Sequence, residues 1–317
     1  MNLAAEAVER FAADLDVLVP AGTAIGVAVS GGPDSLALLL LTAEARPGEV
    51  EAATVDHGLR PESAAEAAMV AELCEKLGVP HRTIVADWSK PPTSNVQAEG
   101  RALRYRLLNE WAIERDLAAV ATAHHADDQA ETLLMRLARG AGVGGLGGTK
   151  VRRALSEQVM LMRPLLGWRK SALVALVENA GIVAVDDPTN RDPKHDRSRI
   201  RKWLASSDWA DPERIAASAS ALRDADEAID WALAPLLSSR IRRNSDALVI
   251  EPFDLPRELK RRLLLAAFAE LGAPVPRGPD LIRALDAIEE GAAVTLSGLK
   301  LEGGTHWRLT LAPPRRA

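Results

Sequence analysis

The chain of 317 residues has a single cysteine, Cys74, so it can form no internal disulfide. One thiol also cannot supply the ligands of a cysteine-based zinc or iron–sulfur site. Long hydrophobic runs are lacking too, since the leucine-rich stretch LALLLL at residues 36–41 is far too short to span a bilayer. These absences argue against disulfide scaffolds, cysteine metal centres and membrane proteins.

An excess of positive charge is also missing. The 39 Lys and Arg residues are outnumbered by 44 Asp and Glu residues, so any polyanionic partner must meet a local basic patch. Residues 1–20 carry acids throughout and lack the basic start and apolar core of a secretory signal. We therefore expect a cytoplasmic protein, long enough for a substantial core and more than one domain.

Short apolar runs alternate with helical patterns over the first two hundred residues. Strands are predicted at residues 25–29, 51–55, 81–85 and 118–123, and helices at 35–45, 62–77 and 96–115. This alternation predicts an α/β fold with a parallel sheet and helices on both faces. Ligands gather at the carboxyl ends of such strands, which directs attention to Ser30, Asp56-His57 and His124-His125.

A further helix is predicted at 129–137, and the character of the sequence changes from about residue 206. We predict a mobile loop for the glycine-rich residues 139–150, a helix ending at Gly181, and, within residues 186–203, a polar loop that leads into a helix. Alanine-rich helical patterns at 212–237, 256–271 and 279–290 then precede a hairpin whose turn is Gly303-Gly304. We predict two domains, 1–207 and 208–317, the second smaller and mostly helical with a terminal hairpin.

The segment Ser30-Gly31-Gly32-Pro33-Asp34-Ser35 joins the first predicted strand to a helix. A helix N-terminus binds anions through its unpaired N–H groups, and glycine lets a phosphate approach closely. Asp34 would repel a phosphate unless a magnesium ion bridged the two. The lysine of a Walker A loop is absent. On its own, the segment is also compatible with a merely small and polar turn.

This segment resembles the SGGxDS loop of the PP-loop ATP pyrophosphatases, which cleave ATP between the α and β phosphates. The resemblance implies a five-stranded parallel sheet and a loop that holds the departing pyrophosphate. It implies ATP and Mg²⁺ as cofactors without naming the substrate. The implied nucleotide-binding residues of the loop are Ser30, Gly31, Gly32, Pro33, Asp34 and Ser35.

Four later segments, TVDHGLRPES, AEGRALRYRLL, TAHHADDQAETLLMRLARGAG and DDPTNRDPKHDRSRIR, follow in order. Together they resemble the tRNA(Ile)-lysidine synthetases over residues 22–203. The resemblance implies adenylation of the wobble cytidine of the minor isoleucine tRNA with a CAU anticodon, attack of L-lysine at C2, and release of pyrophosphate and then AMP. One departure is Ser198, where the family usually has asparagine.

We predict His124, Asp127, Asp128 and Glu131, together with Asp34, as catalytic residues. The first four lie where a predicted strand ends and a helix begins. Asp128 and Glu131 share a helix face, where acids could hold magnesium or the ammonium of lysine. We predict Asp34 and Asp128 as magnesium ligands. The alternative for the aspartates is helix capping. A zinc site is disfavoured because no third, suitably spaced histidine is present.

The remaining predicted contacts lie elsewhere along the chain. Asp56 and His57 end the second predicted strand, where the adenosine of a nucleotide would lie. The resemblance adds Arg197 and Arg201 as active-site arginines. Solvated helix faces are the alternative for the other basic residues. The predicted substrate and tRNA contacts are Arg101, Arg104, Arg136, Asn190, Arg199 and Lys202.

Core packing is the interpretation we favour for the seven tryptophans. The C-terminal domain, with basic clusters at 240–243 and 260–262, either clasps the tRNA stem or serves as a cap or a homodimerisation element. Two rival functions remain open. A tRNA thiolase would usually need catalytic cysteines, and a non-catalytic nucleotide-binding module would need the loop but not the acidic and arginine residues.

Overall fold

The computed structural model describes residues 3–58, 62–88, 96–185 and 196–312. The chain forms two compact units, Met1–Gly140 with Gly145–Ala221, and Ala141–Gly144 with Leu222–Ala317. The division at 221/222 falls inside the long helix α9 (Pro212–Arg240). The domain boundary that we predicted at 207/208 stays a prediction.

The first unit is built on a six-stranded sheet in the order β3-β2-β1-β4-β6-β5. Its strands are β1 (Ile25–Ala28), β2 (Val50–Asp56), β3 (His81–Val85), β4 (Ala119–Ala121), β5 (Arg152–Ala154) and β6 (Met160–Met162). The first five in spatial order run parallel, which confirms the predicted sheet. The edge strand β5 pairs antiparallel with β6 and was missed, because Arg-Arg-Ala carries no apolar pattern.

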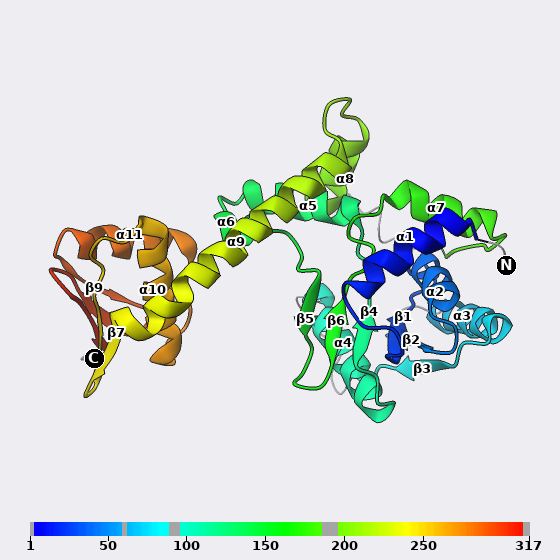
Figure 1. Ribbon diagram of the computed structural model, residues 1–317, viewed down its shortest axis with the longest axis horizontal. Coiled ribbons are helices and arrows are strands. Elements are labelled where there is room, and N and C mark those ends of the chain that lie inside the picture. Colours follow the sequence, from blue (N-terminus) through cyan, green and yellow to red (C-terminus); the bar gives the residue numbers. More distant parts are fainter. Residues whose placement is uncertain (1–2, 59–61, 89–95, 186–195, 313–317) are drawn as a thin grey trace. The chain divides into compact units, whose positions relative to one another are not determined.

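Helices cover both faces of this sheet (Figure 1). One core joins the sheet to α1 (Ala5–Asp16), α2 (Pro33–Ala45), α3 (Ser63–Leu77) and α7 (Lys170–Asn179). The opposite core is formed by α4 (Val96–Glu114). Ile25 and Val27 of β1 enter the first core, whereas Gly26 faces α4, where a Cβ would lie 2.7 Å from the Trp111 ring. Burial on both sides explains the unbroken apolar strands.

The glycine-rich stretch after α5 (Ala126–Leu137) has more structure than we expected. It contains the helical turn α6 (Val143–Leu146). Arg136 Nη1 donates to the carbonyl oxygens of Gly145 at 2.7 Å and Gly148 at 2.9 Å. Arg136, predicted to contact phosphate, thus uses one of its two terminal amino groups to hold this loop.

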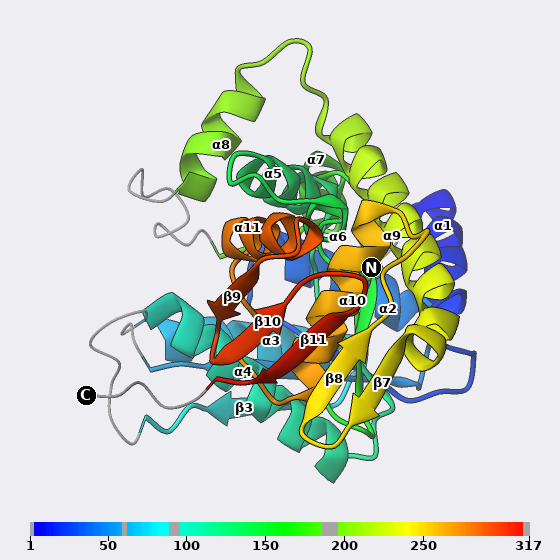
Figure 2. The same ribbon diagram turned by 90° about the vertical axis from the view of Figure 1, so that its left-hand side faces the viewer.

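The second unit combines α10 (Arg257–Glu270), α11 (Gly278–Glu289) and the end of α9 with an antiparallel sheet (Figure 2). The sheet order is β7 (Ile241–Asn244), β8 (Ala247–Ile250), β11 (Trp307–Leu311), β10 (Leu299–Glu302) and β9 (Ala293–Leu296). The predicted turn at Gly303-Gly304 joins β10 to β11. A second turn at Ser297-Gly298, with φ of 48° and 82°, and the hairpin β7–β8 were missed.

This unit therefore contains more strands than we predicted. Its missed strand β7 carries Arg242, Arg243 and Asn244, whose side chains are exposed, so no alternation marks it in the sequence. Within the part of the chain that the structure describes, no helix has the length and apolarity needed to cross a bilayer.

Candidate active site

The PP-loop segment follows β1 at the point where the sheet order changes direction, between β1 and β4. Gly31 has a φ of +79°, a conformation that glycine adopts at little cost. Ser35 Oγ accepts from the Ser30 amide at 3.1 Å and donates to the Gly32 carbonyl at 2.9 Å. The two serine hydroxyls are 3.2 Å apart, and because Ser35 gives its proton to Gly32, Ser30 is the donor between them, so both hydroxyls shape the loop.

Gly32 is the N-cap of α2, and Pro33 is its first residue. No described side chain caps this helix end. The backbone N–H groups that follow Pro33 are therefore available to an anion, and the partial positive charge of the 13-residue helix favours one.

Asp34 lies in the first turn of α2. Its Oδ2 is 3.5 Å from both His125 Nε2 and Lys170 Nζ. Its Oδ1 is buried and has no hydrogen-bond partner among the described residues. Leaving a buried polar atom unsatisfied costs about 1–3 kcal/mol, and a carboxylate oxygen is a ligand that Mg²⁺ prefers. The arrangement fits a magnesium ion.

No cluster of three or more His, Cys, Asp or Glu side chains among the described residues forms a metal cage. Mg²⁺ is usually held by one or two carboxylates, with phosphate oxygens and water completing its shell. Asp34 and Asp128 both lie 3.5 Å from His125 Nε2, so the two predicted ligands share one neighbourhood.

His125 is the residue that joins the loop to α5; our sequence analysis noted the pair His124-His125 but predicted only His124 as catalytic. As N-cap, its Nδ1 accepts from the Asp128 amide at 3.4 Å, while Asp128 Oδ2 accepts from the His125 amide at 3.2 Å. Nδ1 is then unprotonated, and Nε2 carries the proton toward Asp34. Burial lowers the pKa of His125, but the bond to Asp34 and the nearby aspartate charges outweigh it and raise this pKa.

The predicted catalytic residue His124 lies beside His125 in a different environment. Its Nδ1 is 3.1 Å from Thr122 Oγ1. Burial lowers the pKa of His124 to about 3, with Asp128 opposing and the charges of Arg163 and Arg101 adding to the effect. His124 is therefore neutral at physiological pH.

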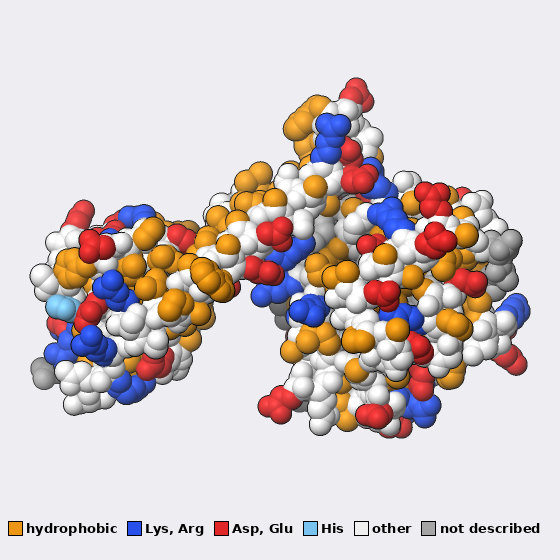
Figure 3. Space-filling model, in the orientation of Figure 1, with side chains coloured by type: hydrophobic (Ala, Val, Ile, Leu, Met, Phe, Trp, Pro, Cys, Tyr) orange, Lys and Arg blue, Asp and Glu red, His pale blue; other side chains and the backbone are white. Residues whose placement is uncertain are grey.

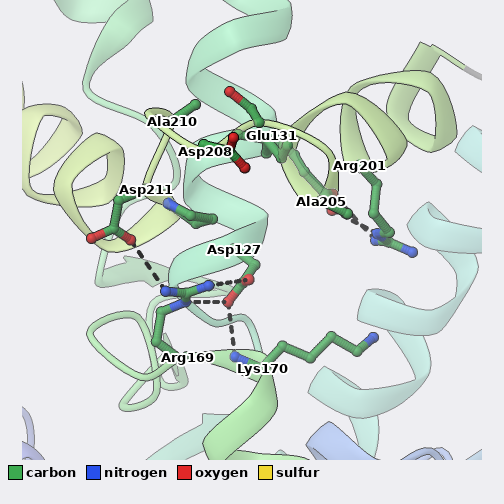
Figure 4. Close-up of a pocket in the computed structure, with 12 residues that line it drawn as sticks. Asp127, Glu131, Arg169, Lys170, Arg201, Ala205, Asp208, Ala210 and Asp211 are labelled. Atoms are coloured by element: carbon green, nitrogen blue, oxygen red, sulfur yellow. Dashed lines mark hydrogen bonds and ion pairs between the residues drawn. The ribbon is translucent and has the colours of Figure 1, made fainter.

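The three predicted acids of α5 have separate partners. Asp127 accepts from the Lys170 amide at 2.8 Å, at the start of α7, and lies 3.4 Å from Arg169 Nε (Figure 4). The pKa of Asp128 is raised by burial but lowered overall by the charges of His125 and Arg197. Asp128 is thus ionised, whereas Asp127 both caps a helix and faces a basic side chain.

Glu131 is 1% exposed and holds two arginines of α8 (Asp196–Ala205). Its oxygens accept from Arg197 Nε at 2.8 Å and from Arg201 Nε at 2.7 Å and Nη2 at 3.2 Å. Both carboxylate oxygens are therefore engaged, and Glu131 anchors the predicted active-site arginines rather than offering a free ligand. Ser198, at the position of the family asparagine, is buried on the same helix.

A cavity of about 420 Å³ opens beside these residues (Figure 4). It brings together acids and bases from α5, α7, α8 and the 207–212 segment. Our sequence analysis did not select Arg169 and Lys170. Their only signal in the sequence was their position at the start of a predicted helix. The cavity is lined by Asp127, Glu131, Arg169, Lys170, Arg201, Leu204, Ala205, Ser207, Asp208, Ala210, Asp211 and Pro212.

Asp56 and His57 lie at the carboxyl end of β2, as predicted. Hydrogen bonds from Ser63 and from the Gly58 amide, the latter at 2.8 Å, lower the pKa of Asp56. Burial, followed by the charge of Arg104, lowers the pKa of His57 despite the opposing Asp56. His57 Nδ1 is buried without a partner among the described residues, and Trp88 lies 6.2 Å from its ring.

The predicted tRNA contacts divide into three groups. Arg101 and Arg104 lie together against the Tyr105 ring on α4. Arg199 and Lys202 are exposed on α8, and Arg199 Nη1 is 3.4 Å from Asp196. Asn190 lies outside the described residues. Elsewhere, acidic and basic side chains are interspersed over the visible faces (Figure 3).

The tryptophans correct one interpretation. Trp111, Trp168 and Trp307 are buried, as expected for core residues. Trp209 and Trp231, however, are 80% and 82% exposed, and Trp203 is 43% exposed. The rings of Trp203 and Trp209 meet edge to face at 5.7 Å, beside the cavity and close in sequence to Lys202. Helical pattern alone did not reveal that these side chains face solvent.

The basic cluster at 260–262 is neutralised within its own unit. Arg262 is 8% exposed and pairs with Asp226, Asp230 and Glu258. Arg261 pairs with Glu258 at 2.6 Å, and Lys260 pairs with Glu289 at 2.9 Å. These cations stabilise α9, α10 and α11 and are poorly placed to grip a nucleic acid.

A model of the PP-loop domain matches residues 4–207. The chain is 48% identical to a tRNA(Ile)-lysidine synthase of Novosphingobium aromaticivorans, over 98% of this chain and 95% of that protein. It is 44% identical to one of Zymomonas mobilis, over 94% of this chain and 91% of the relative. The chain belongs to the tRNA(Ile)-lysidine synthase family. Membership confirms the resemblance drawn from the sequence motifs.

A solved structure shows how widely the fold is shared. The U34-tRNA thiolase of Methanococcus maripaludis superposes with a TM-score of 0.56 at 21% identity, covering 68% of this chain and 77% of the thiolase. At that identity the likeness establishes the PP-loop fold alone. The family assignment depends on the lysidine synthase relatives, and the PP-loop domain confirms that the chain uses ATP.

Proposed function

We propose that the protein is a ligase that uses ATP to join L-lysine to C2 of the wobble cytidine in the minor isoleucine tRNA with a CAU anticodon. One observation carries the proposal: the PP-loop lies against the start of α5, where Asp34 Oδ2 is 3.5 Å from His125 Nε2. The names of the full-length relatives support the reaction and its tRNA substrate. We place the reaction in the cytoplasm, where this tRNA would be met.

The first step would transfer AMP from ATP to the cytosine O2, because the carbonyl oxygen is otherwise a poor leaving group. The PP-loop would hold the departing pyrophosphate with the N–H groups of α2. Magnesium, held by Asp34 with Asp128 nearby, would neutralise phosphate charge. A guanidinium has five N–H donors, so Arg197 and Arg201 can bind the α-phosphate while Glu131 orients them.

In the second step the lysine ε-amine, after losing its ammonium proton to solvent, would attack C2, and the C2–O2 bond would break as AMP leaves with the oxygen. The cavity of about 420 Å³ adjoins Asp127 and Arg201 and carries both signs of charge, as a zwitterionic amino acid requires. We assign lysine to this cavity. Its carboxylate would lie toward Arg169 and Lys170, and its α-ammonium would lie toward Asp208 or Asp211. His124, neutral because burial lowers its pKa to about 3, would contact the base or a phosphate without adding charge.

The test is incubation of the protein with ATP, labelled lysine and either the minor isoleucine tRNA or the methionine tRNA with the same anticodon. Label should enter the nucleoside digest of the isoleucine tRNA, with one AMP and one pyrophosphate formed per lysine. Formation of ADP, or hydrolysis of ATP without label in RNA, would contradict the proposal and favour a nucleotide-binding module.

Cys74 separates this proposal from a thiolase. The thiol is 0% exposed on α3, and burial raises its pKa to about 12, so almost no thiolate forms near neutrality. Cys74→Ala should leave the rate of lysidine formation within about twofold of wild type, because no thiol takes part. A variant that folds normally by circular dichroism but makes no lysidine would revive the thiolase interpretation.

The exposed basic residues of α8 should contribute to tRNA binding. Arg199→Gln with Lys202→Gln should weaken binding and reduce the slope of log affinity against log salt by about one to two, since each phosphate contact releases counterions. Fluorescence anisotropy with labelled tRNA at several salt concentrations measures both effects. Glu213→Gln, an exposed change at the start of α9, is the control, and an unchanged slope in the double variant would remove this patch from the interface.

A further inference from the structure

Four arginines converge on the side chain of Tyr105, away from the PP-loop. The guanidinium carbons of Arg101, Arg104 and Arg153 lie 5.0, 5.5 and 4.8 Å from the centre of the Tyr105 ring. Arg163 follows β6, is 3% exposed, and donates from Nη1 to the Lys150 carbonyl at 2.5 Å. The residues come from α4, β5 and the end of β6, so the fold, and no local motif, assembles this arginine cluster.

The arginine cluster lacks compensating negative charge. Over the described part of the chain, none of its four guanidinium groups forms an ion pair with a carboxylate. Burial lowers the pKa of Arg163, and the charges of Arg153 and Arg101 add to this despite Tyr105. Burial and Arg101 likewise lower the pKa of Arg104. Like charges are thus held together where water screens them poorly.

One hydrogen-bonding group in the cluster is also unsatisfied. Arg163 Nε is buried without a hydrogen-bond partner among the described residues. Burial raises the pKa of the Tyr105 hydroxyl, but the charges of Arg101 and Arg104 and a hydrogen bond with Arg163 lower it overall. Cation–π contact with Tyr105 offsets part of the repulsion between the arginines, but it leaves Arg163 Nε unsatisfied. An oxyanion would accept from this N–H group and neutralise the arginines. Phosphate is the anion that planar guanidinium groups recognise best.

The position of the arginine cluster indicates which phosphate it would bind. Arg163 lies at the carboxyl end of β6, which is next to β4 and two strands from β1. At about 5 Å between strands, the cluster is about 10 Å from the PP-loop, with His124 between them. The charges of Arg163, Arg101 and Arg104 lower the pKa of His124, so their field reaches the reaction centre. The proposed function already assigns the phosphates of ATP, because the departing pyrophosphate goes to the PP-loop and the α-phosphate to Arg197 and Arg201.

We propose that Arg101, Arg104, Arg153 and Arg163, with Tyr105, form a pocket for a backbone phosphate of the substrate RNA beside the reacting base. This inference rests on the proposed function and adds a second anion site to it. A base drawn into an active site needs the flanking backbone held, and phosphate contacts fix position without reading sequence.

The test compares Arg153→Gln and Arg163→Gln with the control Arg152→Gln. Arg152 is an exposed neighbour on β5 whose side chain points to the other side of the strand. Binding of labelled minor isoleucine tRNA is measured by anisotropy, and the KM for ATP is measured by pyrophosphate release. We expect the two cluster variants to bind tRNA about tenfold to a hundredfold more weakly, with the KM for ATP within about twofold of wild type.

Three results would overturn the inference. A raised KM for ATP with unchanged tRNA binding would assign the phosphate to the nucleotide, and unchanged values for both would leave the cluster a cation–π packing element. Equal loss in Arg152→Gln would indicate general electrostatics. If Arg163→Gln does not fold, the half-buried Arg153 decides. Lysidine formation by the wild type tests the proposed function separately, because binding is compared without turnover.

Discussion

Replacing Asp34 with asparagine should lower the rate of pyrophosphate release at least about a hundredfold while the protein remains folded. Asparagine keeps the shape of the side chain and removes its charge. The buried Oδ1, which lacks a hydrogen-bond partner among the described residues, would then be a poor ligand for Mg²⁺. The Mg²⁺ concentration that gives half-maximal rate should rise in the same variant. Release of labelled pyrophosphate over a magnesium series measures both quantities.

Glu44→Gln is the matched control, because Glu44 is an exposed acid on the same helix. It should leave the rate and the magnesium requirement unchanged. If Asp34→Asn released pyrophosphate at the wild-type rate, neither metal nor phosphate would depend on this carboxylate. The PP-loop would then lose its assigned role in the reaction.

The strands of the sheet could be predicted because each one is marked by apolar residues that are consecutive in the sequence. Strands buried on both faces must be apolar throughout, and β1 shows this with Val27 in one core and Gly26 against Trp111 in the other. Parallel strands then bring their carboxyl ends to one edge, so Asp34 and Asp128 were expected to lie near each other. Their common distance of 3.5 Å from His125 Nε2 agrees with that expectation.

The partners of individual side chains could not be predicted in this way. Arg197 and Arg201 meet Glu131 across 66 and 70 residues of chain, and no spacing rule encodes such a contact. The adjacent histidines look equivalent in sequence, yet only His125 caps α5 and faces Asp34. The exposure of Trp209 depends on what lies over it, which only the assembled fold determines.

Glu131→Gln should lower both the stability and the activity of the protein. The glutamate is buried, whereas Arg197 and Arg201 are 44% and 38% exposed. Breaking a buried ion pair costs about 3–5 kcal/mol, and we expect about 3 kcal/mol because the guanidinium groups reach solvent. Both arginines would lose their anchor, so kcat should fall more than the KM for ATP rises. Urea denaturation gives the free energy of unfolding, and initial rates give the kinetic constants.

Asp196→Asn is the matched control for this experiment. Asp196 is 57% exposed and pairs with Arg199 and Arg139 on the surface, so its loss should change the free energy of unfolding by less than about 1 kcal/mol. A Glu131→Gln protein that was as stable as wild type but inactive would mean that the carboxylate acts on substrate directly. A protein that was destabilised by a similar amount yet fully active would mean that Arg197 and Arg201 take no part in catalysis. Only a loss of both stability and activity in Glu131→Gln supports Glu131 as the anchor of two active-site arginines.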